Sequence, residues 1–514
     1  MARTTTVPLS DPSPATSTGQ GRRFVTSHWA PLTVGLFTVV ALVLRLVLAT
    51  DSLLGDELFM YQIVHHRSLG DMLHVVRETE KTPPLFFVLV WAAGKLGPST
   101  EWVRAPSILF GTALVPLVYL LGQRTVGRVA GVVAAVIVAL SPFAVFYGTE
   151  ARAYGALAFL AGLSTLCLLN ALESDRRGWW AAYGLAVVAV LYTHYMGVFV
   201  LGAQAVWAFA AHRERFRSLL VVHALVLLAF LPWLPSFLLQ ESHSAGEAGR
   251  IALLRPPTWS YFGRINAGLL FGHPFLRLPD LPGRIPVAAA LLVVAVGAAA
   301  AVGRAARAGV TGLRWTSPIL LVVLLALATP VGVRLVSLHP DRSFMLVRNL
   351  SASLPAFALL AAWLVVGLPR RLAVVGVAVV LAVVLIGTVK MFNPDNRRSN
   401  YRAAAEFIET HARPGDPVIQ TFFLPAGGAL GKVLSVNFQH PHPLYRSGPP
   451  EAAAWARGRR GADVFVLYGL GGFFKGTKHA GSRAGPGKAF RLVREARYRG
   501  FETVLVGEYR YAPR

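Results

Sequence analysis

Long apolar runs are the feature that most constrains the fold of this chain. Apolar residues make up 54% of its 514 positions, whereas charged residues make up 15%. Many of the apolar residues lie in runs of about 20, the length of a helix that crosses a hydrocarbon core of about 30 Å. A soluble domain carries more charge. We therefore predict a polytopic α-helical membrane protein with eleven spans, at residues 29–49, 102–122, 129–147, 154–173, 179–195, 197–211, 218–239, 285–303, 315–334, 344–366 and 371–390.

The formal net charge of +25 does not by itself indicate a nucleic-acid partner. Much of the excess lies in short arginine-rich connections between predicted spans, as the positive-inside rule leads us to expect. The sequence has no basic stripe interleaved with aromatic residues and no zinc pattern, so we expect no nucleic acid. Its single cysteine, Cys167, lies inside a predicted span, which excludes a disulfide framework and a cysteine metal site.

The distribution of arginines predicts the topology. The arginine-rich connections fall on one side of the predicted spans, which we assign to the cytoplasm. Residues 1–24 are rich in Thr, Ser and Pro and are expected to form a disordered cytoplasmic tail. Residues 25–390 form the predicted membrane domain. The segment from Pro83 to Leu96 begins with two prolines and is too short to span, so we predict an interfacial or re-entrant helix inside one external loop, residues 50–101.

Residues 391–514 differ in character from the membrane domain, and we predict a small extracytoplasmic α/β domain. Residues 401–411 have helical spacing and are followed by a turn signal. The domain is basic, which suits either an anionic acceptor or anionic lipid headgroups. We expect strands at 417–423, 463–467 and 501–506, and a second helix at 488–497.

The acidic residues after the first span are the clearest candidates for chemistry. Gly55-Asp56-Glu57 is followed by Glu80 and Lys81, and the predicted topology places Glu150 on the same external face. Carboxylates at the edge of a membrane are costly, so a chain that groups several of them there usually needs them for its activity. Exposed, solvated loop acids are the alternative interpretation. We interpret the cluster as the site of a membrane enzyme.

Several motifs occur in a characteristic order along the chain. They are Gly55-Asp56-Glu57, Glu80-Lys81-Thr82-Pro83-Pro84-Leu85, Tyr147-Gly148-Thr149-Glu150-Ala151-Arg152-Ala153-Tyr154, Tyr192-Thr193-His194-Tyr195, and Arg348-Asn349-Leu350 with Pro355. In order and sidedness this set resembles the GT-C superfamily of lipid-phosphate-sugar glycosyltransferases, specifically bacterial glycosyltransferase family 39. Protein O-mannosyltransferases and lipid A aminoarabinose transferases are relatives in that group. Asn349 stands where the family usually has Tyr, and Tyr401-Arg402 with the following alanines resembles the tail-domain start of actinobacterial members.

The resemblance implies an inverting glycosyltransferase whose site faces outward. An acceptor hydroxyl loses its proton as it attacks the anomeric carbon, and a positioned carboxylate takes that proton. The family's base corresponds to Asp56, with Glu57 as the alternative, because sequence does not decide which neighbour points into the site. Glu150 corresponds to a second acid that holds donor or acceptor sugar. The alternative for Glu150 is a salt bridge with Arg152 or another base.

The resemblance also names candidates for metal and phosphate contacts. Glu80 and Lys81 correspond to a metal ligand and a phosphate contact, although Thr82 is inserted before the first proline. His194 ends a span on the same side, so Glu80 and His194 are candidate ligands of a divalent cation. The alternative for His194 is an ordinary interfacial residue.

Cations are expected near the leaving lipid phosphate, because its developing charge must be met. Arg348 is the first candidate, with snorkelling to the headgroups as the alternative. Further substrate-binding candidates are Lys81, Tyr147, Arg152, Tyr154 and Arg342. Arg45, near the external end of the first span, is expected to snorkel outward and has no predicted role.

The predicted function is transfer of a monosaccharide, mannose or arabinose, from a polyprenyl-phosphate donor to a cell-envelope glycan, lipid or protein. The predicted location is the bacterial plasma membrane, with many spans, a cytoplasmic N-terminus and membrane lipids as further partners. A lipid-linked sugar flippase is one alternative, and it would be expected to carry charges at several depths. A non-catalytic envelope assembly protein on the same fold is the other.

Overall fold

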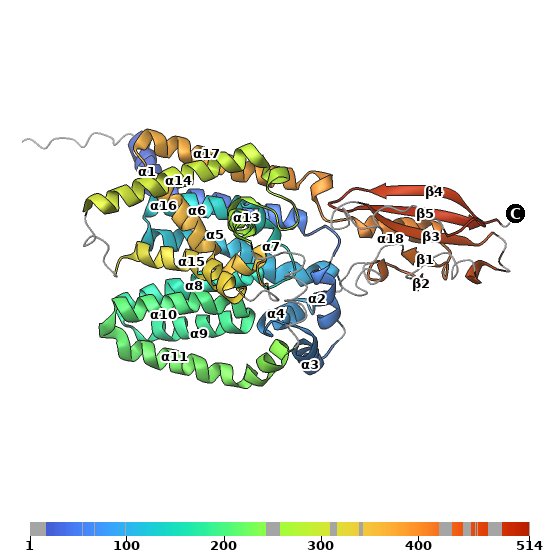
Figure 1. The fold of residues 1–514 in the computed structure, drawn as a ribbon, viewed down its shortest axis with the longest axis horizontal. Helices are drawn as coiled ribbons and strands as arrows, with labels where there is room; N and C mark the ends of the chain where they lie inside the picture. The colour runs from blue at the N-terminus through green and yellow to red at the C-terminus, as the bar shows by residue number, and fades with distance from the viewer. Residues whose placement is uncertain are drawn as a thin grey trace, which may run out of the picture.

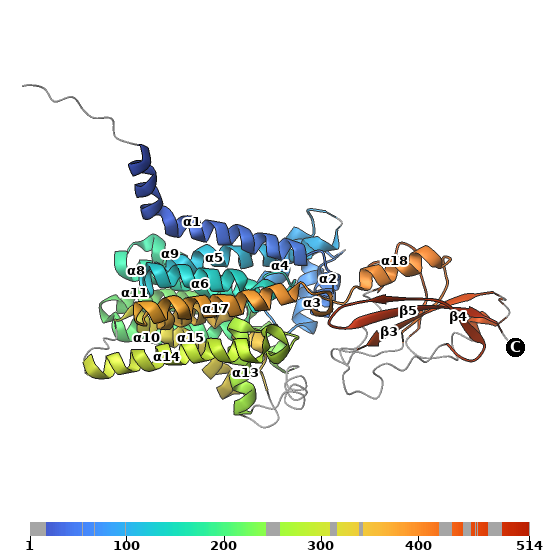
Figure 2. The same ribbon diagram turned by 90° about the horizontal axis from the view of Figure 1, so that it is seen from above.

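A helical bundle and a small sheet domain make up the structure, a computed structural model (Figure 1). It describes residues 17–53, 55–65, 67–97, 99–242, 258–308, 316–338, 343–420, 434–445, 454–457, 459, 461–470 and 486–512. The long helices run side by side, and the sheet domain lies beyond one end of the bundle (Figures 1 and 2). The start of α1 (Ser17–Leu48) lies at the opposite end. This helix begins inside the segment that we expected to be a disordered tail.

The described part of the chain contains eight helices that are long and apolar enough to cross a membrane. Many large apolar side chains on their outer surfaces are exposed, among them Leu36, Leu227 and Ile285, which is expected of helices that face lipid. These spans contain α1, α5 (Ala105–Thr125), α8 (Tyr154–Ser174), α11 (Phe216–Phe230), α14 (Arg284–Ala308), α15 (Pro318–Val336), α16 (Leu354–Val366) and α17 (Arg370–Met391). The polytopic helical fold is therefore confirmed.

The other three predicted spans coincide with shorter helices, α6 (Arg128–Leu140), α9 (Arg177–Thr193) and α10 (Val198–Ala211). Residues 129–147 were expected to be one span, but the helix breaks at Ser141. Pro142 cannot donate to the preceding turn, and the Ser141 hydroxyl accepts from the Ala144 amide, which caps a new helix, α7 (Pro142–Tyr147). Short helical segments join the longer helices: η2 (Tyr195–Gly197), η3 (Arg213–Arg215), η4 (Leu231–Trp233), η5 (Pro279–Gly283) and η7 (Val347–Ser353). Helix α13 (Trp259–Phe271) packs against α7 and η7.

The segment after the first span folds at the end of the bundle beside the sheet domain. It contains α2 (Asp56–Val64), α3 (Leu69–Thr79), α4 (Leu85–Ala93) and η1 (Thr100–Arg104). We call it the acidic segment. The nine residues of α4 extend ~14 Å at 1.5 Å per residue, far short of a bilayer core. The short proline-led helix therefore does not traverse the bundle, as predicted.

The tail domain is built on a five-stranded sheet of order β2-β1-β3-β5-β4. The strands are β1 (Val418–Gln420), β2 (Leu444–Tyr445), β3 (Asp463–Leu470), β4 (Phe490–Tyr498) and β5 (Thr503–Tyr511). β1 is parallel to β2 and β3, whereas β5 is antiparallel to β3 and β4. Helix α18 (Tyr401–His411) packs against β4 and β5, and η8 (Pro394–Asn396) lies in the connection from α17.

The prediction of a helix at residues 488–497 is wrong, because these residues form most of β4. Its side chains are charged at intervals that also fit a helix, but the strand pairs with β5 along its whole length, from Phe490 opposite Tyr511 to Tyr498 opposite Val504. Tertiary pairing decides the conformation where local preference is weak. The strands predicted at 463–467 and 501–506 are present as β3 and β5, and residues 421–423 of the first predicted strand lie outside the described residues.

The tail domain and the acidic segment share one apolar core. Leu58 and Met72 from the acidic segment belong to the same buried cluster as Tyr401 and Ile408 of α18 and Val506 of β5. Because burial of apolar area stabilises the contact, the tail domain is docked on the acidic segment.

Candidate active site

The turn before α2 brings two carboxylates to the start of a helix. Gly55 has a φ of 54° and a ψ of −118°, a conformation that side-chain-bearing L residues rarely adopt. The turn directs the chain into α2 with Asp56 and Glu57 in its first turn, where the helix dipole favours negative charge. The two neighbouring acids then point into different surroundings.

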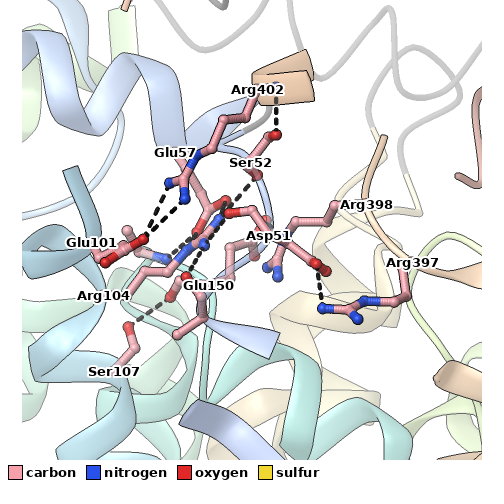
Figure 3. Close-up of polar contacts among 12 residues, drawn as sticks. Asp51, Ser52, Glu57, Glu101, Arg104, Ser107, Glu150, Arg397, Arg398 and Arg402 are labelled. Atoms are coloured by element: carbon pink, nitrogen blue, oxygen red, sulfur yellow. Dashed lines mark hydrogen bonds and ion pairs between the residues drawn. The ribbon is translucent and has the colours of Figure 1, made fainter. Parts of the chain in front are cut away.

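Glu57 is fully buried and contacts three other parts of the chain (Figure 3). Arg104 donates to both of its oxygens, at 2.8 and 2.7 Å, and the Ala151 amide donates at 2.9 Å. The Arg398 guanidinium lies 3.5 Å from the same carboxylate. Burial raises the pKa of Glu57, but Arg104, Arg398 and the hydrogen bonds outweigh burial and lower it below its ordinary value. Glu57 is therefore a carboxylate that joins the acidic segment to its neighbours.

Arg104 is equally buried, and all five of its guanidinium donors are used. Besides Glu57, it donates to the backbone carbonyls of Ala49, Asp51 and Ser52. These bonds hold the chain as it leaves α1. The sequence prediction did not include Arg104, although a basic residue at the predicted external edge of a span was a usable signal.

Asp56 is in a more open place than Glu57. Its Oδ2 accepts from Arg348 Nη1 at 2.8 Å, and the exposed fractions of the two side chains are 35% and 28%. Burial raises the pKa of Asp56, but Arg348 and Arg152 lower it below its usual value. Asp56 is thus an ionised carboxylate beside a single directly bonded cation, within reach of solvent.

Two tyrosines lie beside this pair. The Arg348 guanidinium is 5.7 Å from the centre of the Tyr154 ring, a cation–π distance. The Tyr147 and Tyr154 rings meet edge to face at 4.8 Å. Arg348 therefore faces Asp56 and an aromatic surface, so the alternative of an arginine that only snorkels to lipid headgroups does not describe its contacts.

Glu150 is the third acid of the cluster and has a different proton affinity. It is 5% exposed and lies between α7 and α8, where Ser107 Oγ donates to its backbone carbonyl at 2.6 Å. Burial raises the pKa of Glu150 to about 8, the charges of Glu57 and Asp56 raise it as well, and Arg398 and Arg348 oppose them. Glu150 therefore binds a proton more tightly than Asp56 and Glu57 do.

Arg152 pairs with Glu80 at 3.5 Å. Arg152 therefore forms its ion pair with Glu80, and not with Glu150 as the alternative interpretation proposed. Lys81 lies in the turn before α4, beside Glu80. Arg342 lies outside the described residues.

The candidate metal ligands do not form a convincing metal site. Glu80 is engaged with Arg152, and His194 Nδ1 accepts from the Met196 amide at 3.2 Å. His194 lines a small cavity together with Arg152 and Tyr154, so cationic Arg152 lies where a metal would need an anionic ligand. Within the described ranges, no group of three or more His, Cys, Asp or Glu side chains is arranged to hold a metal ion.

Arg45 does not snorkel outward, which corrects our expectation. It is fully buried in α1 and donates to the carbonyls of Ala41, at 2.9 Å, and Ala144, at 3.0 Å. A Cβ on Gly148 would collide with its guanidinium, so the small residue in the Tyr147-Gly148 motif makes room for it. Arg45 thereby connects the first span to the helix that precedes Glu150.

The site therefore combines two acids of lowered pKa, one acid of raised pKa and several cations at the tail-domain end of the bundle. The structure brings together Asp56, Glu150, Arg348, Tyr147 and Tyr154, whereas Glu57 faces Arg104 and Arg398. An arrangement of groups with separated proton affinities can take a proton at one position and donate a hydrogen bond at another.

Comparisons with known proteins show what the sequence and the fold are similar to. Residues 81–237 match the family model described as dolichyl-phosphate-mannose-protein mannosyltransferase. No curated protein sequence matches the chain significantly. Among solved structures, ArnT from Cupriavidus metallidurans in the apo state is similar over 94% of this chain and 98% of its own, with 16% identity and a TM-score of 0.55.

Two further structures are also similar. ArnT from the same organism bound to undecaprenyl phosphate covers 93% of this chain and 98% of its own, with 16% identity and a TM-score of 0.51. The oligosaccharyltransferase from Archaeoglobus fulgidus in the apo form covers 86% of this chain and 69% of its own, with 11% identity and a TM-score of 0.50. At these identities the likeness is one of fold.

Proposed function

We propose that the chain is a glycosyltransferase of the GT-C type that uses a polyprenyl-phosphate sugar, because its fold is similar to that of ArnT and residues 81–237 match the mannosyltransferase family model. Two comparisons support this donor class. The matching family model is described by a dolichyl-phosphate sugar, and one of the similar structures contains undecaprenyl phosphate. Both are long isoprenoid phosphates, which a membrane-embedded site can take directly from the bilayer.

The observation that carries the proposal is the half-open Asp56–Arg348 pair. A donor phosphate entering the site competes with Asp56 for Arg348, because a guanidinium binds phosphate and carboxylate by the same geometry. When Arg348 turns to the phosphate, Asp56 loses its closest cation, and its pKa rises towards the range of an effective general base. Donor binding would thus activate the base.

Transfer then proceeds as an in-line displacement. Asp56 takes the proton of the acceptor hydroxyl as the acceptor oxygen forms a bond to the anomeric carbon. The bond from that carbon to the phosphate oxygen breaks, and its electron pair leaves with the polyprenyl phosphate. Arg348 stabilises the charge that develops on the leaving group, with Arg152 and Lys81 as further cations on that side. Attack opposite the leaving group inverts the anomeric configuration.

Glu150 and the tyrosines would hold the sugars. A carboxyl group that keeps its proton at neutral pH can donate a hydrogen bond to a sugar hydroxyl while its other oxygen accepts one. Tyr147 and Tyr154 provide an aromatic surface beside Arg348, against which a sugar ring can pack.

We further propose mannose or arabinose as the sugar and a cell-envelope glycan, lipid or protein as the acceptor. The site would face the exterior of a bacterial plasma membrane, with the N-terminus in the cytoplasm. The clustering of arginines in the connections at the opposite end from the site supports this orientation.

A panel of radiolabelled polyprenyl-phosphate sugars, incubated with the purified protein and an envelope-glycan extract, tests the proposal. We expect one donor to lose its label to the extract and to release polyprenyl phosphate. Nucleotide sugars serve as the control for donor class and should give no transfer. A folded protein that binds donors but transfers no sugar from any of them would overturn the proposal, and movement of intact donor between leaflets would favour a flippase.

A further inference from the structure

The connection from α17 to α18 and the first turn of α18 carry three arginines that each pair with an acid of the acidic segment or its flanks (Figure 3). Arg397 pairs with Asp51 at 2.5 Å, Arg398 with Glu57 at 3.5 Å, and Arg402 with Glu101 at 3.1 Å. We call them the linker arginines. They attach the tail domain to the membrane domain, but their surroundings differ.

Arg398 is the buried member of the three. Its side chain is 4% exposed, against 28% for Arg397 and 43% for Arg402. The Arg398 guanidinium lies 4.4 Å from the centre of the Phe146 ring, next to Tyr147 of the site. Its Nη2 is buried and has no hydrogen-bond partner among the described residues. Burying a cation with an unpaired donor costs free energy. We therefore expect the charge of Arg398 to act on the two carboxyl groups near it, those of Glu57 and Glu150.

The position of Arg398 depends on the docked tail domain. The Phe501 amide, from the loop between β4 and β5, donates to the Arg397 carbonyl at 2.8 Å. On the other side, the Arg402 amide donates to Ser52 Oγ at 2.9 Å. The residues that flank Arg398 are therefore held by the tail domain and by the acidic segment at once.

We propose that Arg398 is a positioning residue, through which the docked tail domain holds Glu57 and Glu150 in the arrangement that the site needs. The proposal rests on the proposed glycosyltransferase function. Arg398 would not touch the sugar donor. It would act through Glu57, which also binds the amide that follows Glu150, and through its charge on Glu150 itself.

The charges around Glu150 give the proposal a measurable consequence. Burial, Glu57 and Asp56 raise the pKa of Glu150, while Arg398 and Arg348 lower it. Arg104 also faces this cluster through its pair with Glu57. Loss of Arg398 removes one of the opposing cations, so the pKa of Glu150 should rise further.

His273, which follows α13, also faces the cluster beside Arg398. Burial and the charge of Arg398 lower the pKa of His273 to about 3, so it is neutral across the relevant range. A pH response near and above neutrality is therefore assigned to Glu150 and not to His273.

Full-length protein in lipid nanodiscs provides the test. Transfer rates are measured against pH for wild type, Arg398→Gln, Arg398→Lys and the matched control Arg402→Gln. We expect Arg398→Gln to lose transfer on the order of tenfold to hundredfold, as outer-shell partners of other sites do. The transfer rate of this variant should fall on the alkaline side at a pH about one unit higher than in wild type. We call this decline of the rate the alkaline limb. Arg398→Lys keeps the charge and should restore the limb, and Arg402→Gln should leave the limb in place.

A second measurement separates this proposal from the proposed function. The infrared band of the protonated Glu150 carboxyl, identified by its loss in Glu150→Gln, is titrated without any substrate. If wild type transfers no sugar but Arg398→Gln still moves this titration upward, the glycosyltransferase proposal fails and the positioning role stands. If Arg398→Gln does not fold, Arg398→Met keeps the apolar stem against Phe146 and takes its place. The opposite outcome is an equal loss of transfer rate in the Arg398 and Arg402 variants, with no shift of the alkaline limb or of the infrared titration. It would show that these arginines only attach the tail domain, and it would overturn the proposal.

Discussion

Asp56 and Glu57 are neighbours in sequence, yet the structure gives them opposite environments. Glu57 is fully buried among Arg104, Arg398 and a backbone amide, and both of its oxygens are occupied. Asp56 is 35% exposed and has one directly bonded cation, Arg348, which is itself partly exposed. Removing one partner of a buried ion pair leaves an uncompensated charge, so opening the ion pairs of Glu57 would cost much free energy. The Asp56 pair can open when a competing anion arrives.

Neighbouring acids in one ionisable cluster can therefore have different roles. A carboxylate whose oxygens all accept hydrogen bonds from protein groups stabilises the fold, because it has no free lone pair for a substrate. An acid that keeps one exchangeable partner and access to solvent is suited to chemistry.

Asp56→Asn should nearly abolish transfer while leaving the fold unchanged. The amide keeps the shape of the side chain but cannot take the acceptor proton, and general-base catalysis typically contributes about 10²- to 10⁴-fold. Initial transfer rates with a saturating donor measure the loss, and binding of the lipid donor serves as the control for folding. A variant with the wild-type rate would remove Asp56 from the mechanism.

Glu57→Gln should destabilise the protein more than it alters the intrinsic chemistry. Arg104 and Arg398 would both face a neutral amide inside the protein, and breaking a buried pair costs about 3–5 kcal/mol. Unfolding of the purified protein in detergent, followed by tryptophan fluorescence, measures the effect. Unchanged stability together with lost transfer would reverse the roles that we give to the two acids.

Glu150→Gln should change how stability depends on pH. The pKa of Glu150 rises from its ordinary value of 4.5 to about 8 in the folded protein, mainly through burial. Between those pH values the folded chain keeps a proton that the unfolded chain has released, so wild type loses stability as pH rises, by ~1.4 kcal/mol per unit of pKa difference. The variant lacks this loss, and its melting temperature relative to wild type should increase from pH 5 to pH 8. A difference that is constant over this range would contradict the raised pKa.

Glu101→Gln should have the smallest effect. Glu101 and its partner Arg402 are 44% and 43% exposed, and surface ion pairs of this kind contribute about 0–1 kcal/mol. The same unfolding measurement applies, so this variant is the matched control for Glu57→Gln. A loss comparable to that of the Glu57 variant would mean that attachment of the tail domain, and not burial of charge, controls stability.

Prediction from sequence succeeded where the signal was local or compositional. Apolar runs predicted the membrane helices, and the double proline with a short apolar stretch predicted that α4 would not cross. The structure also brings together five residues that the resemblance named, Asp56, Glu150, Arg348, Tyr147 and Tyr154, and their roles stay predictions.

Residues whose roles depend on distant partners were missed. Arg104 and Glu57 are 47 positions apart, and Arg398 meets Glu57 only because the tail domain docks. Arg45 was expected to reach headgroups, but glycines at 111 and 148 allow the neighbouring helices to approach and enclose it. The prediction of a helix at residues 488–497 was wrong because the pairing of β4 with β5 is not visible in the spacing of these residues.

The amino-acid sequence alone determined that this chain enters a membrane, which segments are long enough to span it, and that acids gather beside the first span, because these properties depend on composition and run length. Tertiary packing determines which of the two adjacent acids is buried and which is partly exposed, and it brings a tail-domain arginine to the buried acid. Burial and ion pairing are set by residues far apart in the chain, and their contacts form only when the helices pack and the tail domain docks.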